Sequence, residues 1–136
     1  MPFAVLYMME RNGWTVADVR PQLARTGGLA GLSGIAGGDV RDLEKAASEG
    51  HQDAALALDV FTYQVRKTIG AFAAAMGGLD AIAFTGGIGE NSPSLRAASC
   101  AGLEFLGVRL DAARNQAGAG DRIVSVDDSS VGVVAL

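Results

Sequence analysis

A glycine-rich loop is the segment of this sequence best suited to hold a ligand. It reads FTGGIGEN over residues 84–91, after a short apolar run and before a helix expected to open at Ser92. Glycine lacks a Cβ, so Gly86, Gly87 and Gly89 let a ligand approach the backbone. Free N–H groups at the start of the following helix favour an anionic or polar ligand. A tight strand-to-helix turn with no ligand explains the spacing equally well.

Two familiar phosphate-binding motifs do not fit this loop. A P-loop requires a lysine followed by serine or threonine after its second glycine, and no lysine follows here. A dinucleotide fingerprint requires a third glycine where this sequence has Ser92. The loop therefore matches neither of these two motifs.

A second candidate lies at Asp39, Val40, Arg41 and Asp42, after another glycine-rich segment. An aspartate and an arginine two positions apart at a helix start can offer an acceptor and a planar donor to one ligand. The alternative is a helix N-cap at Asp39 followed by solvated charges, and the spacing by itself favours that alternative.

The other reactive residues give weaker signals. His51 is the only histidine and fits a surface position at a helix start, while Cys100 fits a small buried residue better than a nucleophile. No cysteine and histidine cluster predicts zinc. The acidic run 127–130 resembles a cation site, but a hairpin turn explains it more simply.

The elements that must position these residues mix helices with short strands. Thr15 and Asp18 have the spacing of a capping box. The segment 26–38 holds six glycines and is expected to be a packed loop, anchored by Leu29, Leu32 and Ile35. An apolar stripe marks one long helix and comprises Leu58, Phe61, Val65, Ile69, Phe72 and Met76. The expected helices are 2–11, 16–24, 39–49, 58–76 and 93–101. The expected strands are 79–84, part of 103–110, 123–126 and 131–136, and the strand 79–84 is expected to be buried and of parallel type. Residues 112–121 are expected to be a loop or the end of a helix.

Composition limits the class of protein. The chain has 136 residues, of which 49% are apolar and 19% charged, enough to bury a core in about one α/β domain. The net charge of −4 argues against a nucleic-acid surface, and no apolar run is long enough for a membrane helix. A single cysteine and a start without a signal-peptide pattern predict a cytoplasmic protein. The sequence stops inside its last apolar strand, from which we expect a truncated unit.

These segments together resemble the C-terminal portion of the acetate/propionate/butyrate kinase family. The resemblance rests on residues 58–96, LDVFTYQVRKTIGAFAAAMGGLDAIAFTGGIGENSPSLR, on GLEFLGVRLD at 102–111, and on SGIAGGDVRDL at 33–43. It implies an incomplete actin/hexokinase/Hsp70-like (ribonuclease H-like) nucleotide-binding domain. It also implies transfer of a phosphoryl group between ATP and a short-chain carboxylate such as acetate, giving an acyl phosphate and ADP, with Mg²⁺.

The resemblance assigns roles only at matched positions, where it implies contact with the adenosine side of ATP or ADP. The positions implied are Asp39, Val40 and Arg41, together with Gly87, Ile88, Gly89, Glu90 and Asn91. A β-branched side chain at Gly89 is expected to block the approach of the base. Gly37 and Gly38 stand where the family often has serines, and we expect a looser loop there.

The resemblance also implies what these 136 residues do not supply. The family's phosphate-binding, carboxylate-binding and catalytic segments correspond to sequence upstream of Met1, and VGVVAL at 131–136 stops before the family's Thr-Asn-Glu-Glu segment, whose glutamate helps hold magnesium. We therefore expect this chain to be a kinase fragment that is inactive by itself. The resemblance further implies a homodimer. One alternative is a non-catalytic nucleotide-binding or dimerisation module derived from the enzyme; a sugar kinase or chaperone-type ATPase of the same superfold fits the loop less well.

Overall fold

The computed structural model describes residues 2–118 and 120–136, and the chain divides into two compact units, residues 1–58 and 59–136. From the sequence, residues 118–120 are most simply a turn with a glycine at each end; Gly118 and Gly120 have positive φ, and Ala119 lies outside the described residues. No helix in the described ranges is both long and apolar enough to cross a membrane.

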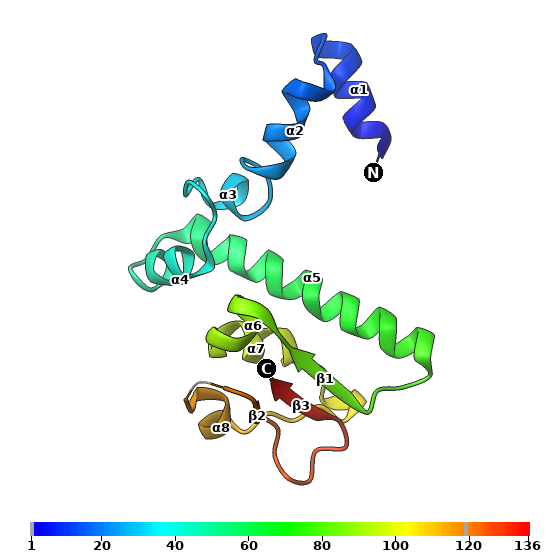
Figure 1. Ribbon diagram of the computed structural model, residues 1–136, viewed down its shortest axis with the longest axis vertical. Coiled ribbons are helices and arrows are strands. Elements are labelled where there is room, and N and C mark those ends of the chain that lie inside the picture. The colour runs from blue at the N-terminus through cyan, green and yellow to red at the C-terminus, as the bar shows by residue number, and fades with distance from the viewer. Residues whose placement is uncertain (1, 119) are drawn as a thin grey trace. The chain divides into compact units, whose positions relative to one another are not determined.

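The first unit consists of short helices closed by local caps (Figure 1). The Thr15 backbone N–H donates to Asp18 Oδ2 at 2.8 Å, and the Asp18 N–H donates back to Thr15 Oγ1 at 3.4 Å, so the predicted capping box is confirmed. The helices are α1 (Pro2–Asn12), α2 (Val16–Ala24), α3 (Gly28–Ser33), α4 (Val40–Ser48) and the start of α5 (Gln52–Met76).

The glycine-rich segment 26–38 is packed rather than loose. It contains the short helix α3, where only a loop is expected from the sequence. Leu29 and Ile35 pack against a core of Leu43, Ala54 and Ala57, whereas the third expected anchor, Leu32, is exposed. At Gly38, φ is +60° and an added Cβ would lie 2.6 Å from the Ala30 nitrogen. The expectation of a looser loop is therefore wrong at Gly38, because this position packs against backbone and has no room for a side chain.

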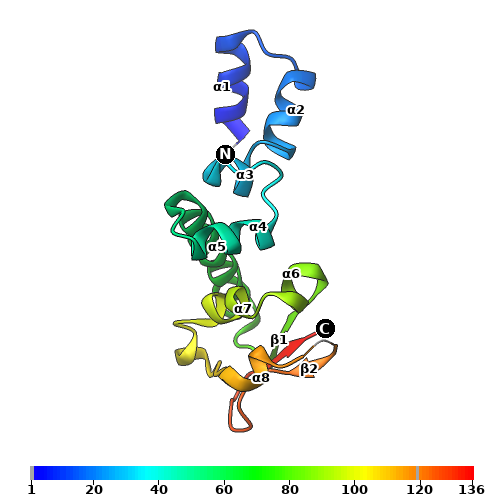
Figure 2. The ribbon, with the colours of Figure 1, turned by 90° about the vertical axis from the view of Figure 1, so that its left-hand side faces the viewer.

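The second unit is built on a three-stranded mixed sheet in the order β1-β3-β2 (Figure 2). Strand β1 (Ala81–Phe84) runs parallel to β3 (Gly132–Ala135), with Ile82 opposite Val133, and β2 (Arg122–Ile123) runs antiparallel on the other side of β3. The sequence predicts both the parallel strand and the hairpin correctly. The strand 79–84 is not wholly buried, however: within β1 only Ile82 is buried, because successive side chains of a strand point to opposite faces and one face of this sheet lies on the core.

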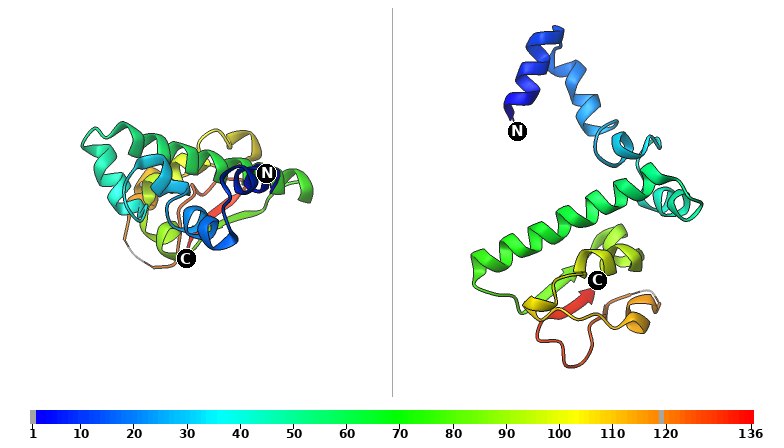
Figure 3. Two further views of the ribbon diagram at one scale, coloured as in Figure 1. Left: turned by 90° about the horizontal axis from the view of Figure 1, so that it is seen from above. Right: turned by 180° about the vertical axis from the view of Figure 1, so that it is seen from behind.

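Helices surround this sheet and complete its core. The 59–76 part of α5 lies alongside the sheet in Figures 1 and 3, and its Ile69 packs against the buried side chains of the core. Helix α7 (Pro93–Cys100) contributes Cys100, and the segment after it contributes Leu103 and Val108. The two last members of the predicted apolar stripe, Phe72 and Met76, are exposed.

Three segments of the second unit differ from the sequence-based expectation. The loop 86–91 forms a six-residue helix, α6 (Gly86–Asn91). The segment 103–110 forms a 3-10 turn, η1 (Glu104–Leu106), and only isolated bridges at Val108 and Leu110, so it is not a regular strand. The segment 112–121 contains α8 (Ala112–Gln116). Helix α8 has a local signal that the sequence reading leaves unused, since its N-cap Asp111 accepts from the Arg114 N–H at 2.9 Å.

Candidate functional site

Helix α6 carries the five predicted contact residues of the glycine-rich loop. Gly86 starts the helix with φ +71°, which glycine adopts readily, directly after β1. Gly89 has an ordinary helical φ and is needed for a different reason: a Cβ there would lie 2.8 Å from the carbonyl carbon of Phe84 and 3.3 Å from its Cα. The absence of a side chain at Gly89 thus lets α6 pack directly on the end of β1.

A small, mainly apolar cavity of about 290 Å³ opens beside α6. Two of the predicted positions, Ile88 and Gly89, line it from α6, and Phe84 and Thr85 line it from the end of β1. The remaining lining residues come from α5 and α7 and are Phe61, Val65, Leu95, Arg96 and Ser99. Pockets of this kind, with apolar walls and a few polar groups, are typical of small-molecule sites.

The other loop positions hold α6 itself together. Asn91 Nδ2 donates to the Gly87 carbonyl at 2.9 Å, and the Glu90 carbonyl accepts from Arg96 at 2.7 Å. Gly87 has no atom within 4 Å of where a Cβ would stand. The structure therefore gathers Gly87, Ile88, Gly89, Glu90 and Asn91 into one helical turn, with Ile88 and Gly89 facing the cavity.

Sequence reasoning does not single out Arg96. This side chain is 1% exposed and bonds to carbonyls of α6 and α8 and to Asn115, which is itself buried. A single arginine in a helix of small residues is ordinarily solvated, so a local pattern gives no signal for it. A sequence feature related to this role can be recognised only once the structure is known: Arg96 stands one helical turn after Ser92, the N-cap of α7.

The second predicted pair, Asp39 and Arg41, lies in the first unit at the start of α4. Asp39 is the N-cap, and its carboxylate accepts from the Arg41 backbone N–H at 2.9 Å and from Arg41 Nε and Nη2 at 3.1 and 2.8 Å. Arg41 is 85% exposed, whereas Val40 is buried in the unit. The N-cap interpretation is therefore confirmed for Asp39, and the bidentate pair presents the guanidinium plane to solvent.

Hydrogen bonds from Arg41 hold the pKa of the Asp39 carboxyl down at about 2. We expect replacement of Arg41 by Gln to raise this pKa toward the ordinary value of about 3.9, with a residual lowering from the backbone N–H of residue 41. Because the folded-state pKa is depressed, the contribution of Asp39 to stability is present above its unfolded pKa and is lost as the pH falls toward 2.

Carbon-detected NMR titration of the Asp39 carboxyl measures this change. The matched control is Arg114→Gln, because Arg114 pairs with Asp127 in the other unit and should leave the Asp39 titration unchanged. An Asp39 midpoint that stays near 2 in Arg41→Gln would show that the ion pair is not its cause.

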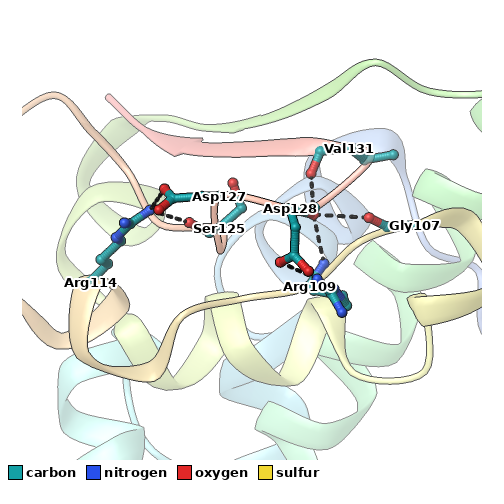
Figure 4. A network of polar contacts seen from close by, with 8 residues as sticks. Gly107, Arg109, Arg114, Ser125, Asp127, Asp128 and Val131 are labelled. Atoms are coloured by element: carbon teal, nitrogen blue, oxygen red, sulfur yellow. Dashed lines mark hydrogen bonds and ion pairs between the residues drawn. The ribbon is translucent and has the colours of Figure 1, made fainter.

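The acidic run 127–130 is a hairpin turn held by arginines (Figure 4). Arg114 Nη1 donates to Asp127 Oδ1 at 2.7 Å, and Arg109 forms an ion pair with Asp128. Ser129 Oγ lies within this network 2.9 Å from the Gly107 carbonyl and 2.7 Å from the Val131 carbonyl, and its single hydrogen can be donated to either. The carboxylates are thus committed to cations of the chain, and the hairpin interpretation is confirmed.

No metal site is assigned to this chain. Among residues 2–118 and 120–136 no group of three or more histidine, cysteine, aspartate or glutamate side chains is placed to hold an ion. His51 caps α5, accepting from the Ala54 N–H at Nδ1, and Cys100 is buried, which raises the pKa of its thiol to about 11. Both residues have the structural roles that the sequence favours, because an un-ionised buried thiol is a poor nucleophile.

Relatives of known identity match this chain along its whole length. A family model described as "Acetokinase family" matches residues 1–136. The chain is 48% identical over 136 residues to an acetate kinase of Caldanaerobacter subterraneus and 44% identical over 135 residues to one of Heliobacterium modesticaldum, covering 99% of this chain and 34% of each relative. It therefore spans about a third of the length of these relatives.

Solved structures agree with the sequence matches. An acetate kinase of Porphyromonas gingivalis superposes with a TM-score of 0.92 at 34% identity, covering 100% of this chain and 34% of that one. A propionate kinase of Francisella tularensis superposes with a TM-score of 0.85 at 29% identity, covering 99% of this chain and 34% of that one. The resemblance drawn from the sequence is confirmed: the chain belongs to the acetokinase family.

Proposed function

We propose that this chain is the C-terminal, nucleotide-binding portion of a kinase that transfers the γ-phosphoryl group of ATP to acetate or a similar short-chain carboxylate, giving the acyl phosphate and ADP. In this proposal the chain supplies the adenosine side of the ATP site, within an incomplete actin/hexokinase/Hsp70-like domain. Its support is the family membership over residues 1–136 and the names of relatives such as the acetate and propionate kinases above.

The observation that carries the proposal is the apolar cavity beside α6. Its walls include Phe61, Val65, Phe84 and Leu95, which suit the flat apolar faces of a nucleobase, and the hydroxyl of Thr85 and backbone groups near Gly89 suit its polar edge. A polyphosphate is a poor occupant because the one cationic residue of the lining, Arg96, already donates four hydrogen bonds to oxygens of the chain.

The predicted contacts of Asp39 and Arg41 with adenosine are a separate proposal, made for the first unit by itself. The exposed guanidinium plane of Arg41, held by Asp39, can stack on a base or donate to a ribose hydroxyl. Val40 is buried, so its contribution is to anchor this turn rather than to touch the nucleotide through its side chain. Magnesium belongs to the proposed reaction, but no set of ligands for it stands among the described residues, and we derive no step through it.

We also propose a homodimer. Phe3, Leu6 and Tyr7 lie three and four positions apart on α1, so they share one helix face, and all three are exposed. Burying such an apolar face against a second copy is the usual way in which a protein removes it from water. The alternative function, a nucleotide-binding or dimerisation module without catalysis, rests on this same face and on the cavity.

Titration calorimetry of the chain with adenosine, ADP and ATP tests the nucleotide site. We expect weak binding in which adenosine competes about as well as ATP, since the cavity offers contacts to the base and none to a polyphosphate. ATP binding that is more than about tenfold tighter than adenosine binding, a difference of about 1.4 kcal/mol, would contradict the assignment to the adenosine side. No binding of any of the three would contradict the proposed site as a whole.

A further inference from the structure

A buried arginine joins three helices behind the proposed nucleotide loop. From α7, Arg96 Nη1 donates to the carbonyls of Gly89 and Glu90, both at 2.7 Å. Its Nε donates to Asn115 Oδ1 at 2.8 Å, and its Nη2 donates to the Asn115 carbonyl at 2.6 Å. One side chain thereby ties the end of α6 and the end of α8 to α7.

The four bonds that hold this guanidinium end on neutral oxygens rather than on a carboxylate. Burial and then the nearby charge of Arg122 lower the pKa of Arg96 from its usual high value. A cation in that setting is stabilised by carbonyl groups at the ends of helices, where backbone dipoles point their negative ends at it. Because these acceptors belong to α6 and α8, the charge is satisfied only while both helix ends stay in place.

Asn115 braces the arginine from the other side. It is buried, its Oδ1 accepts from Arg96, and its Nδ2 donates to the carbonyl of Pro93 at 2.8 Å. Pro93 is the first residue of α7, so the bonds run from α7 through Asn115 and back to α7. Such a closed, fully bonded polar network fixes one arrangement of its members.

We infer that Arg96 is a positioning residue of the nucleotide site: it fixes the end of α6 and so sets where Ile88 and Gly89 stand at the cavity. Although Arg96 also lines the cavity, its donors are bonded to the chain, so it acts on the ligand through α6. This inference takes its ligand, adenosine, from the proposed function. The bracing of α6 by Arg96 can be tested without any ligand.

Hydrogen exchange measured by mass spectrometry on the full chain tests the bracing. Arg96→Lys keeps the charge but offers a single nitrogen that cannot reach four acceptors. We expect amide exchange in 86–91 to rise about tenfold or more while exchange in β3 stays as in the parent chain. The matched control is Arg66→Lys, because Arg66 Nη2 donates to the Ala98 carbonyl of α7 and no hydrogen bond within the described ranges joins Arg66 to α6.

A second variant covers the case in which Arg96→Lys does not fold. Asn115→Ala removes the side-chain acceptor of Arg96 and leaves its bonds to α6, so exchange in 86–91 should rise about threefold, and in any case more than in Arg66→Lys. Equal exchange in 86–91 for Asn115→Ala and Arg66→Lys, or unchanged exchange in Arg96→Lys, overturns the bracing of α6.

Adenosine titration of the same proteins separates the bracing from the proposed function. We expect Arg96→Lys to lose about tenfold or more in adenosine affinity while Arg66→Lys keeps it. If α6 loosens but the affinity holds, the positioning role is overturned. If the parent chain binds no adenosine and α6 still loosens in Arg96→Lys, the proposed function fails and the bracing stands.

Discussion

Replacing Gly89 by Val should abolish adenosine binding by this chain. A Cβ at this position would lie 2.8 Å from the Phe84 carbonyl carbon and 3.3 Å from the Phe84 Cα, so backbone would have to move before the branched side chain could fit. Gly89 also lines the cavity, so the added methyl groups would take up space meant for the base. Both effects act in the same direction, and we expect binding to fall below detection.

The control for this variant stands on α5, at a glycine that does not line the cavity. Gly70→Ala adds a Cβ with no atom within 4 Å, at a position without positive φ, so it should leave the fold and the binding unchanged. Calorimetry with adenosine measures the affinities, and near-ultraviolet circular dichroism reports whether the unit is folded. Retention by Gly89→Val of adenosine affinity within about threefold of the parent chain would disprove the close packing of α6 on β1.

The second large effect is on turnover: the 136-residue chain should produce no acetyl phosphate from ATP and acetate, even with saturating magnesium. Phosphoryl transfer requires a clamp on the transferred group, neutralisation of its charge and a site for the acceptor. Loss of one such stabilising group typically costs about 100- to 1,000-fold in rate. Among the described residues no group of three or more metal-ligating side chains is placed together, and the one cation of the cavity lining, Arg96, is bonded to the chain, so two such losses combine.

Hydroxamate trapping of acetyl phosphate measures this turnover against a blank without protein. A preparation of the Gly89→Val variant, purified in the same way, shows how much activity comes from contaminating host enzyme. Acetyl phosphate formed by the parent chain above both controls would contradict the prediction. It would also show that residues of this chain or of a second copy supply the parts that we do not find.

The sequence predicts the helices and strands of this fold better than it predicts which of their side chains are buried. The capping box at Thr15 and the hairpin before residue 131 are encoded by neighbours in the chain, and both are confirmed. The exposure of Ala81 and Ala83 on β1 is not encoded locally, because it depends on which face of the sheet the rest of the unit covers.

The candidate site shows the same division. The glycines of 86–91 are visible in the sequence, but the reason for Gly89 is contact with Phe84, which only the packed structure shows. Arg96 is invisible to pattern reasoning, since its role depends on carbonyls of α6 and on Asn115. The family resemblance names the loop as a nucleotide contact, and the assignment of individual contact residues stays a prediction for the titrations above.

The central place of β3 sets an order for the folding of the second unit during synthesis. β1 ends at Phe84 and cannot pair until the ribosome has made the chain through Gly132, and β2 also waits for β3. Until then the apolar β1 is an open edge, which is the kind of surface that recruits foreign strands or chaperones. A ribosome that stalls after Phe84 and before Gly132 therefore leaves a nascent chain whose helices can form and whose sheet cannot.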